Sequence, residues 1–291
     1  MSKKMKSSLV LLGLSIMVLV MAACGNNNNA SGNNATGTNA ISSNASTNPA
    51  NDTKDEPETK VELTISAAAS LTDALNEIQK TYEEKNPNVK LNFNFGASGA
   101  LQQQIEQGAP ADLFLSASSK NLKALVDKQL IDTDKQINLL SNKLVVVVPG
   151  DSGAALATEA DLTKVEVKHV AIGIPESVPA GNYAKESLTN AKLWDSLQSK
   201  AVQGKDVRQV LQYVETGNAD AGFVYKTDAL TSDKVKIAFY VDPATYTAIQ
   251  YPIGVVKATK HGKEAEGFYT YLQSQEALDV FVKYGFSVPE K

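Results

Sequence analysis

Residues 61–85 read VELTISAAASLTDALNEIQKTYEEK, and this stretch decides the fold class. Residues 61–66 are mostly β-branched or apolar, as in a buried strand, and small residues follow them as a short loop. From Ser70 to Lys85 apolar side chains recur every three or four positions, which predicts a helix with one buried face. A strand, a short loop and a helix in this order form the repeating unit of α/β proteins.

The same unit recurs along the rest of the chain. Further strands are predicted at 89–95, 113–116, 144–148, 169–174, 222–225 and 251–256, and further helices at 98–107, 119–128, 180–189, 206–216, 262–274 and 275–284. This amount of alternating structure suits two domains of ordinary size. We therefore expect two lobes, each a mostly parallel sheet flanked by helices, with residues 61–143 and 251–291 in lobe I and residues 144–250 in lobe II.

The N-terminus has a different character. Basic residues among the first six positions precede an apolar run, Leu9 to Val20, and two alanines stand directly before Cys24, the single cysteine of the chain. The order is that of a secretory signal peptide, and the run is short for a membrane-spanning helix. It resembles a bacterial lipoprotein signal, in which residues 1–23 are removed and Cys24 carries the lipid. A plain secretory signal with a free cysteine is the alternative.

Residues 24–60 are rich in Asn, Ser, Thr, Ala and Gly. Such a composition cannot bury enough apolar surface to offset the entropy lost on ordering. We expect a flexible tether between a lipid anchor and the folded part, of a length that suits a Gram-positive envelope.

The charge balance limits the partners that we expect. Lys and Arg total 28 against 32 Asp and Glu, without a basic stripe, so we expect no binding to nucleic acid. Loss of residues 1–23 removes three lysines and no acid, which lowers the formal net charge from −4 to −7. An anion would therefore bind only where the site itself supplies a local positive potential.

The loops that join strands to helices could supply that potential. Four of them span residues 67–73, 96–100, 178–181 and 205–208. In α/β proteins ligands bind beyond the carboxyl ends of the strands, and helix N-termini there offer free N–H groups and partial positive charge. Each feature also has an ordinary explanation: Ser70, Ser98 and Asp206 as helix caps, Pro179 as a helix starter, and Tyr225 as a core aromatic residue.

Other classes of site are less well supported. The run Gly96 to Ala100 lacks the G-x-S-x-G pattern of a nucleophile elbow. The two histidines, His169 in a strand and His261 in a turn, are poorly placed as general bases or metal ligands. Asp112 and Asp228 could act as acids, but Asp112 is better explained as ordering the backbone. We therefore expect no enzymatic activity, no metal site and no cofactor.

Binding of an organic acid would normally require an arginine. Arg208 is the only arginine of the chain, and we interpret it as a salt-bridged support for the turn at Asp206. A tethered structural or adhesive domain would need an exposed interaction patch, and the sequence shows none.

Several motifs carry a resemblance to a known family. They are AAASLTDAL at 67–75, FGASGALQQQIEQGAPADLFLSA at 95–117, VPAGNYAKESL at 178–188, DVRQVLQYVETGNADAGFVYKTDA at 206–229 and YGF at 284–286. In order and spacing they resemble the molybdate-binding proteins of ABC importers, over nearly all of residues 61–288.

The resemblance implies a type II periplasmic-binding-protein fold with the ligand in the cleft between the lobes. It implies an oxyanion held by uncharged donors, without direct metal ligation. Carried over by motif position, the ligand-binding residues are Ser70, Ser98, Ala180, Val207 and Tyr225, with Ala180 and Val207 acting through their backbone N–H groups.

The function implied is that of a monomeric extracytoplasmic lipoprotein. It would be anchored to the outer face of the cell membrane and would deliver molybdate or tungstate to an ABC permease with a cytoplasmic ATPase. The alternative is a binding protein for sulfate or another small oxyanion. Hydrogen phosphate is a poorer ligand for a set of donors, because its own proton needs an acceptor.

Overall fold

The computed structural model describes residues 60–153 and 155–289. The predicted signal peptide, Cys24 and all of the predicted tether except Lys60 lie outside the described residues. Both lobes belong to one compact unit. Within the described part of the chain no helix is both long and apolar enough to cross a membrane.

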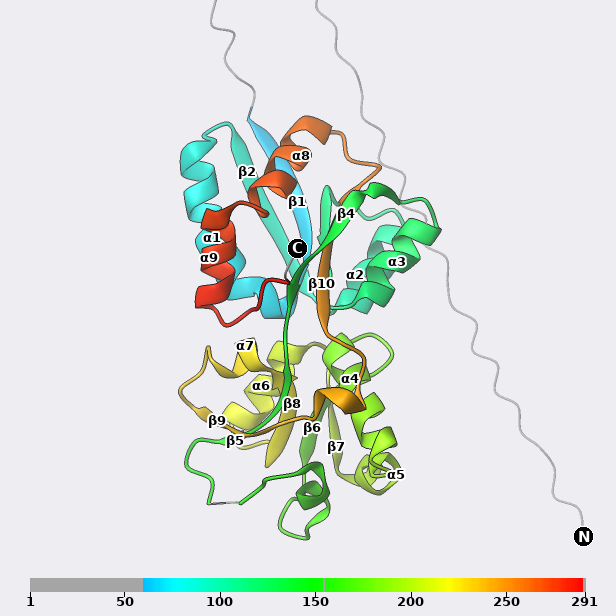
Figure 1. Cartoon of the computed structure of the whole chain (residues 1–291), viewed down its shortest axis with the longest axis vertical. Coiled ribbons are helices and arrows are strands. Elements are labelled where there is room, and N and C mark those ends of the chain that lie inside the picture. Colours follow the sequence, from blue (N-terminus) through cyan, green and yellow to red (C-terminus); the bar gives the residue numbers. More distant parts are fainter. Residues whose placement is uncertain (1–59, 154, 290–291) are drawn as a thin grey trace, which may run out of the picture. The chain divides into compact units, whose positions relative to one another are not determined.

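Lobe I is built on a five-stranded sheet in the order β2-β1-β3-β10-β4. Its strands are β1 (Val61–Ala68), β2 (Val89–Gly96), β3 (Leu113–Leu115), β4 (Ile131–Ser141) and β10 (Gln250–Val256). The helices α1 (Thr72–Lys85), α2 (Ser98–Glu106), α3 (Ser119–Asp127), α8 (Gly262–Tyr271) and α9 (Gln275–Lys283) flank it (Figure 1). A short 3-10 turn, η1 (Ala69–Leu71), joins β1 to α1.

Lobe II has a second five-stranded sheet in the order β7-β6-β8-β5-β9. Its strands are β5 (Leu144–Pro149), β6 (Val170–Gly173), β7 (Ala201–Gly204), β8 (Ala221–Tyr225) and β9 (Val235–Tyr240). The helices are α4 (Pro179–Asn190), α5 (Trp194–Leu197), α6 (Val207–Glu215) and α7 (Lys226–Ala229), with 3-10 turns η2 (Glu159–Thr163), η3 (Gln198–Lys200) and η4 (Pro243–Thr245).

Each sheet is mixed, with four strands running one way and one running against them. In lobe I β1 is parallel to β2 and β3, whereas β10 is antiparallel to β3 and β4. In lobe II β6 is parallel to β7 and β8, whereas β5 is antiparallel to β8 and β9. The predicted two-lobed α/β fold is confirmed.

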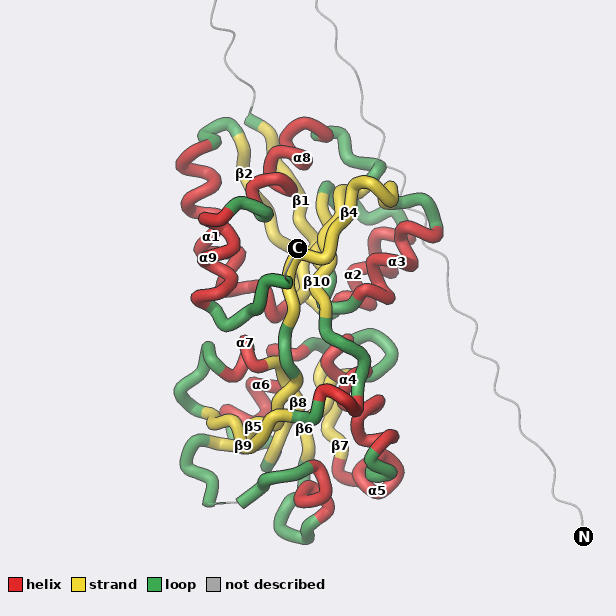
Figure 2. The backbone as a smooth tube through the Cα atoms, viewed as in Figure 1, coloured by secondary structure: helices red, strands yellow, loops and turns green. Residues whose placement is uncertain are grey.

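The chain passes between the lobes twice. It leaves lobe I through residues 142–143, between β4 and β5, and returns through residues 241–249, between β9 and β10 (Figure 2). The carboxyl ends of β1 and β2 therefore face the starts of α4 and α6 across the space between the lobes.

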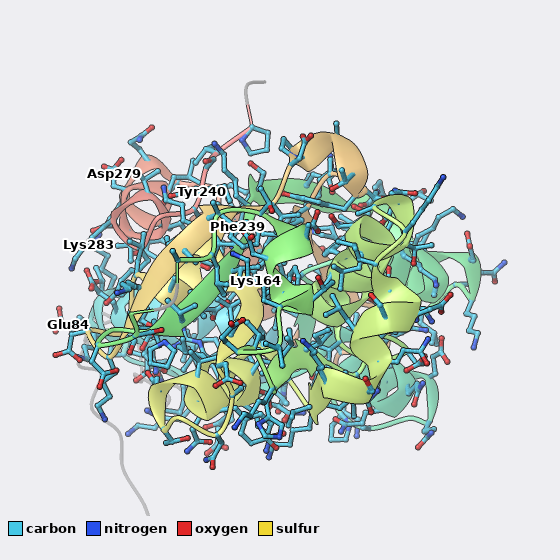
Figure 3. The ribbon with its side chains drawn as sticks, turned by 90° about the horizontal axis from the view of Figure 1, so that it is seen from below. Glu84, Lys164, Phe239, Tyr240, Asp279 and Lys283 are labelled. Atoms are coloured by element: carbon cyan, nitrogen blue, oxygen red, sulfur yellow. The ribbon has the colours of Figure 1, made fainter. Side chains whose placement is uncertain are left out.

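Helices on both faces bury the central strands. Every residue of β5 except its last is at most 1% exposed, as its continuous run of β-branched residues predicts. The predicted strands did not include β4, β7 or β9. These elements are short or lie at an edge of their sheet, where one side stays open to solvent and the apolar pattern weakens. Tyr240 at the end of β9 is 52% exposed (Figure 3).

Candidate functional site

A small cavity lies where the two lobes meet, at the ends of β1 and β2 and the starts of α4 and α6. It holds about 200 Å³ free of protein atoms. Pockets for drug-sized ligands measure about 300–1,000 Å³, so this cavity suits a compact ligand better than a drug-sized one. All five predicted ligand-binding residues line it: Ser70, Ser98, Ala180, Val207 and Tyr225.

The chemical character of the lining is uniform. Small residues (Ala68, Ala69, Gly96, Ala97 and Ala117) form much of the rest of the wall. Among the described residues that line it, Tyr225 is the only one with an ionisable side chain. The cavity therefore offers neutral hydrogen-bond donors without a fixed side-chain charge.

Ser70 is not a helix cap. It lies inside the η1 turn and is 3% exposed, and neither the cap of η1 nor that of α1 is a serine. Its hydroxyl instead forms a hydrogen bond with the hydroxyl of Tyr251 on β10, at 2.8 Å. The capping explanation is therefore wrong for Ser70.

Ser98 is the first residue of α2 and is fully buried. The cap of this helix is Ala97, so the capping explanation is wrong here too. The Ser98 hydroxyl accepts a hydrogen bond from the N–H of Ala117 at 2.9 Å. Its own proton has no acceptor within the described residues and is available to a group in the cavity.

Tyr225 ends β8 and is 1% exposed. Its ring packs edge-on against Tyr251, as a core aromatic residue would. Its hydroxyl, however, has no hydrogen-bond partner among the described residues. Burial, with the neighbouring Tyr251, raises the pKa of Tyr225 well above its usual value, so the hydroxyl stays a neutral donor.

Ala180 and Val207 contribute through the starts of their helices. Ala180 is the second residue of α4 after Pro179, and Val207 is the first residue of α6. The first N–H groups of a helix have no partner inside it and carry its positive dipole end. Asp206 caps α6 by accepting from the N–H of Gln209 at 2.9 Å. Two helix starts thus meet the two serines at one cavity.

The comparisons with known proteins place this fold in a family. Residues 63–287 match the family of bacterial extracellular solute-binding proteins. The chain belongs to this family. It is 53% identical over 238 residues to YvgL of Bacillus subtilis strain 168, covering 82% of this chain and 91% of the relative, whose name assigns it to the substrate-binding lipoproteins of ABC transporters.

Two further proteins are similar in sequence. The molybdate-binding protein ModA of Haemophilus influenzae is 38% identical over 228 residues, 77% of this chain and 89% of the relative. A solved structure from Clostridium difficile, titled as the substrate-binding domain of a molybdenum ABC transporter, is 46% identical. It has a TM-score of 0.62 and covers 79% of this chain and 100% of its own.

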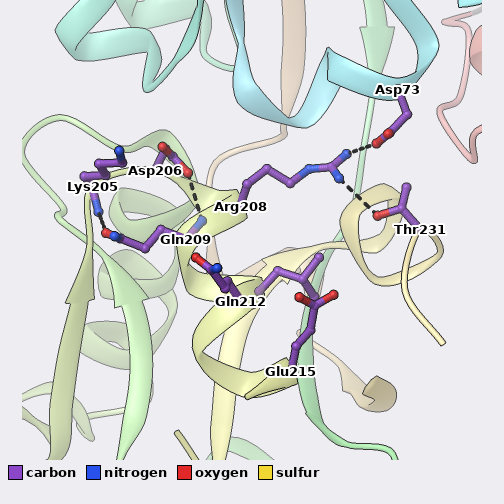
Figure 4. A pocket seen from close by; sticks show the side chains of 9 residues that line it. Asp73, Lys205, Asp206, Arg208, Gln209, Gln212, Glu215 and Thr231 are labelled. Carbon is purple, nitrogen blue, oxygen red and sulfur yellow. Dashed lines mark hydrogen bonds and ion pairs between the residues drawn. The ribbon is translucent and has the colours of Figure 1, made fainter. Parts of the chain in front are cut away.

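Arg208 of this solute-binding protein is salt-bridged, as predicted, but its partners lie outside the turn at Asp206, so its assignment as a support for that turn is wrong. Its guanidinium pairs with Asp73 of lobe I at 2.5 Å and with Asp228 of lobe II at 2.7 Å. It also donates to Thr231 at 3.1 Å (Figure 4). These contacts belong to a separate pocket along α6, with about 880 Å³ free of protein atoms. Arg208 does not line the small cavity.

The other titratable candidates also lie outside the cavity. Asp112 accepts from the N–H of Thr64 and the hydroxyl of Thr259, which confirms that it orders the backbone. Burial raises the pKa of Asp228 to about 6, and the charge of Arg208 opposes this rise. Neither His169 nor His261 lines the cavity. The described residues contain no group of three or more His, Cys, Asp or Glu that could hold a metal ion.

Sequence reasoning missed two residues outside the cavity lining: Tyr251 contacts the lining residue Ser70, and Asn142 contacts Tyr251. Tyr251 is 1% exposed and forms the hydrogen bond to Ser70. Asn142, between β4 and β5, donates to the Tyr251 hydroxyl at 3.2 Å. A tyrosine at the start of a buried strand was a weak signal for the first, and the sequence carried no signal for the second.

Proposed function

We propose that this chain is an extracytoplasmic substrate-binding protein that captures molybdate or tungstate and delivers it to an ABC permease. The observation that carries the proposal is the buried, unpartnered hydroxyl of Tyr225 in a cavity lined by neutral donors. A buried donor without a partner costs about 1–3 kcal/mol, which an acceptor in the cavity would recover. The name of the relative from Haemophilus influenzae, a molybdate-binding protein, supports the same ligand.

The energies suit a compact dianion. Hydrogen bonds to a charged group contribute roughly 1.5–3 kcal/mol each, so five donors give a gross gain of roughly 8–15 kcal/mol. Two helix starts add about 0.3–1 kcal/mol each. Micromolar to nanomolar affinity needs about 8–12 kcal/mol net. The gross gain leaves room for the costs of dehydrating the ion and ordering the lobes.

Binding without chemistry is the activity that this lining supports. General acid–base catalysis needs a positioned side chain that can exchange a proton near the working pH, and nucleophilic catalysis by a serine needs a base beside its hydroxyl. The serines of the cavity have an amide and a tyrosine as hydrogen-bond partners, neither of which is a base at neutral pH. The ligand would leave the protein unchanged, as transport requires.

The membrane anchor is part of the proposal. Cys24 would carry a lipid at the outer face of the membrane of a Gram-positive bacterium, and residues 24–60 would tether the lobes as a monomer. The name of YvgL, a lipoprotein, supports this arrangement. The loaded lobes would then dock on a permease that is driven by a cytoplasmic ATPase.

Calorimetry on the chain without residues 1–23 tests the ligand. Molybdate, tungstate, sulfate and hydrogen phosphate are titrated in parallel at about pH 8. We expect micromolar or tighter binding of molybdate and tungstate, weaker binding of sulfate, and the weakest binding of hydrogen phosphate. Tight binding of sulfate alone would favour the alternative oxyanion. Absence of binding by all four ions would overturn the proposal.

A further inference from the structure

A line of hydrogen bonds runs from the crossing between the lobes to the wall of the cavity. The amide oxygen of Asn142 accepts from the backbone N–H of Lys143 at 2.8 Å. The amide nitrogen of Asn142 faces the hydroxyls of Thr227, at 2.9 Å, and Tyr251, at 3.2 Å. The Tyr251 hydroxyl in turn contacts the hydroxyl of Ser70 at 2.8 Å.

The chemistry of Asn142 gives this line one direction. An amide nitrogen has two protons and no acceptor site, and here both protons have a partner. The N–H of Lys143 fixes which end of the amide is the oxygen. The Tyr251 hydroxyl must therefore accept from Asn142.

Among the hydrogen bonds of the described residues, the acceptor left for the single proton of Tyr251 is the oxygen of Ser70. Tyr251 is 1% exposed, and the alternative, with Ser70 donating, would leave the Tyr251 proton buried without a partner. Burial raises the pKa of Tyr251 well above its usual value, which keeps that proton in place at neutral pH. The proton of Ser70 is thus directed toward the cavity.

We propose that Asn142 and Tyr251 are positioning residues that hold the Ser70 hydroxyl as a donor and so set the selectivity of the cavity against protonated anions. This inference rests on the proposed oxyanion-binding function. A ligand O–H beside Ser70 would find no acceptor there for its own proton, whereas a proton-free oxygen needs only the donor that Ser70 offers. The selectivity is therefore determined by residues that do not touch the ligand.

Asn142→Asp tests the direction of the line. The new carboxylate accepts where the amide donated, so the Tyr251 proton turns toward position 142 and the Ser70 proton turns toward Tyr251. Ser70 then presents only lone pairs to the cavity. We expect the ratio of the hydrogen phosphate Kd to the molybdate Kd, measured by calorimetry at about pH 8, to fall at least about tenfold.

The ratio separates this effect from the added negative charge. Molybdate, sulfate and hydrogen phosphate are all dianions under these conditions, so a purely electrostatic effect weakens the three about equally. Sulfate, which carries no proton, should weaken together with molybdate. Equal weakening of all three ions would overturn the inference.

Two further variants keep the test independent of folding defects. Tyr251→Phe keeps the ring that packs against Tyr225 and Phe286, and frees Ser70 from its donor. It should lower the molybdate affinity and the ratio about three- to tenfold. Tyr246→Phe is the matched control: this tyrosine is also buried, and its hydroxyl accepts from the N–H of Leu144 at 3.2 Å, away from the cavity lining. It should leave the ratio unchanged.

Coupling to Ser70 gives the decisive comparison. If Asn142 acts through Ser70, then Asn142→Asp should not change the ratio in a Ser70→Ala background. A wild-type chain that fails to bind molybdate would refute the proposed function itself. A wild-type chain that binds, with the same ratio in the wild type, Asn142→Asp and Tyr251→Phe, would refute only the role of the two positioning residues.

Discussion

Tyr225 has a buried hydroxyl that forms no hydrogen bond with the described residues. The ring is packed against Tyr251, but the oxygen has no partner among the described residues. We therefore expect the same atom to have opposite effects on the stability of the ligand-free protein and on the proposed ligand binding. A substitution that removes the oxygen and keeps the ring separates the two.

Tyr225→Phe makes this separation. We expect the ligand-free protein to be as stable as the wild type or up to about 1 kcal/mol more stable, because an unpaired buried donor is lost. We expect the molybdate affinity to fall about ten- to a hundredfold, through loss of a hydrogen bond to a charged group. Thermal unfolding and calorimetry give the two values. A destabilised variant with unchanged affinity would mean that the hydroxyl supports the fold instead.

At the scale of the elements, the position of the first turn of α4 depends on its close packing against β6. Gly181 is the third residue of α4, and a Cβ added there would lie 1.9 Å from the carbonyl oxygen of Gly173. Only glycine lets the helix approach this closely. The position of the Ala180 N–H in the cavity therefore depends on its neighbour.

Gly181→Ala should push α4 away from the sheet. We expect a loss of about 1–3 kcal/mol in the free energy of unfolding, as for other overpacked cores, and at least about tenfold weaker molybdate binding. Gly262→Ala at the first position of α8 is the control, because nothing lies within 4 Å of the added Cβ. Denaturant unfolding and calorimetry on both variants check this. Equal behaviour of the two alanine variants would show that the approach of α4 is not required.

Some of the strands could be predicted from the sequence and others could not. The run of valines in β5 predicted a strand buried on both faces, because the pattern depends only on local composition. The edge strand β4 combines exposed polar residues with a few apolar ones, and pairing with β10 stabilises it despite that pattern. Its formation depends on a partner more than a hundred positions away in the chain.

The site, too, could be predicted only in part from the sequence. Ser70, Ser98, Ala180, Val207 and Tyr225 could be named by motif position, and the structure brings them to one cavity. Their role as ligand contacts stays a prediction. The hydrogen bond between Ser70 and Tyr251 joins residues 181 positions apart, and that between Asn142 and Tyr251 joins residues 109 positions apart. No local pattern encodes either contact, so the direction of the donors could not be predicted.

At the scale of the whole molecule, the relevant contacts are those that join lobe I to lobe II. Both lobes supply donors to the cavity, so a bound ion would hold them together. The protein also has direct contacts between the lobes: Arg208 pairs with Asp73, and the N–H of Gly99 donates to the carbonyl of Ser177 at 2.9 Å. The ion pair can be removed without touching the cavity lining.

Asp73→Asn is the change that isolates this ion pair. Arg208 keeps its buried partner Asp228, whereas Arg208→Gln would leave that carboxylate buried and unpaired. We expect nearly unchanged stability and about two- to fivefold weaker molybdate binding, because a partly exposed pair contributes only modestly. Small-angle scattering should show a larger radius of gyration without ligand and the wild-type value at saturating molybdate.

The control lies on the same helix. Glu77 of α1 pairs with Lys283 of α9 at 2.7 Å, and both residues belong to lobe I. Glu77→Gln removes an ion pair of similar kind without affecting the contact between the lobes, so it should leave both the molybdate Kd and the scattering unchanged. If Glu77→Gln weakened binding as much as Asp73→Asn, the effect would reflect the general loss of negative charge on α1. In that case the pair between Asp73 and Arg208 would have no specific part in closure.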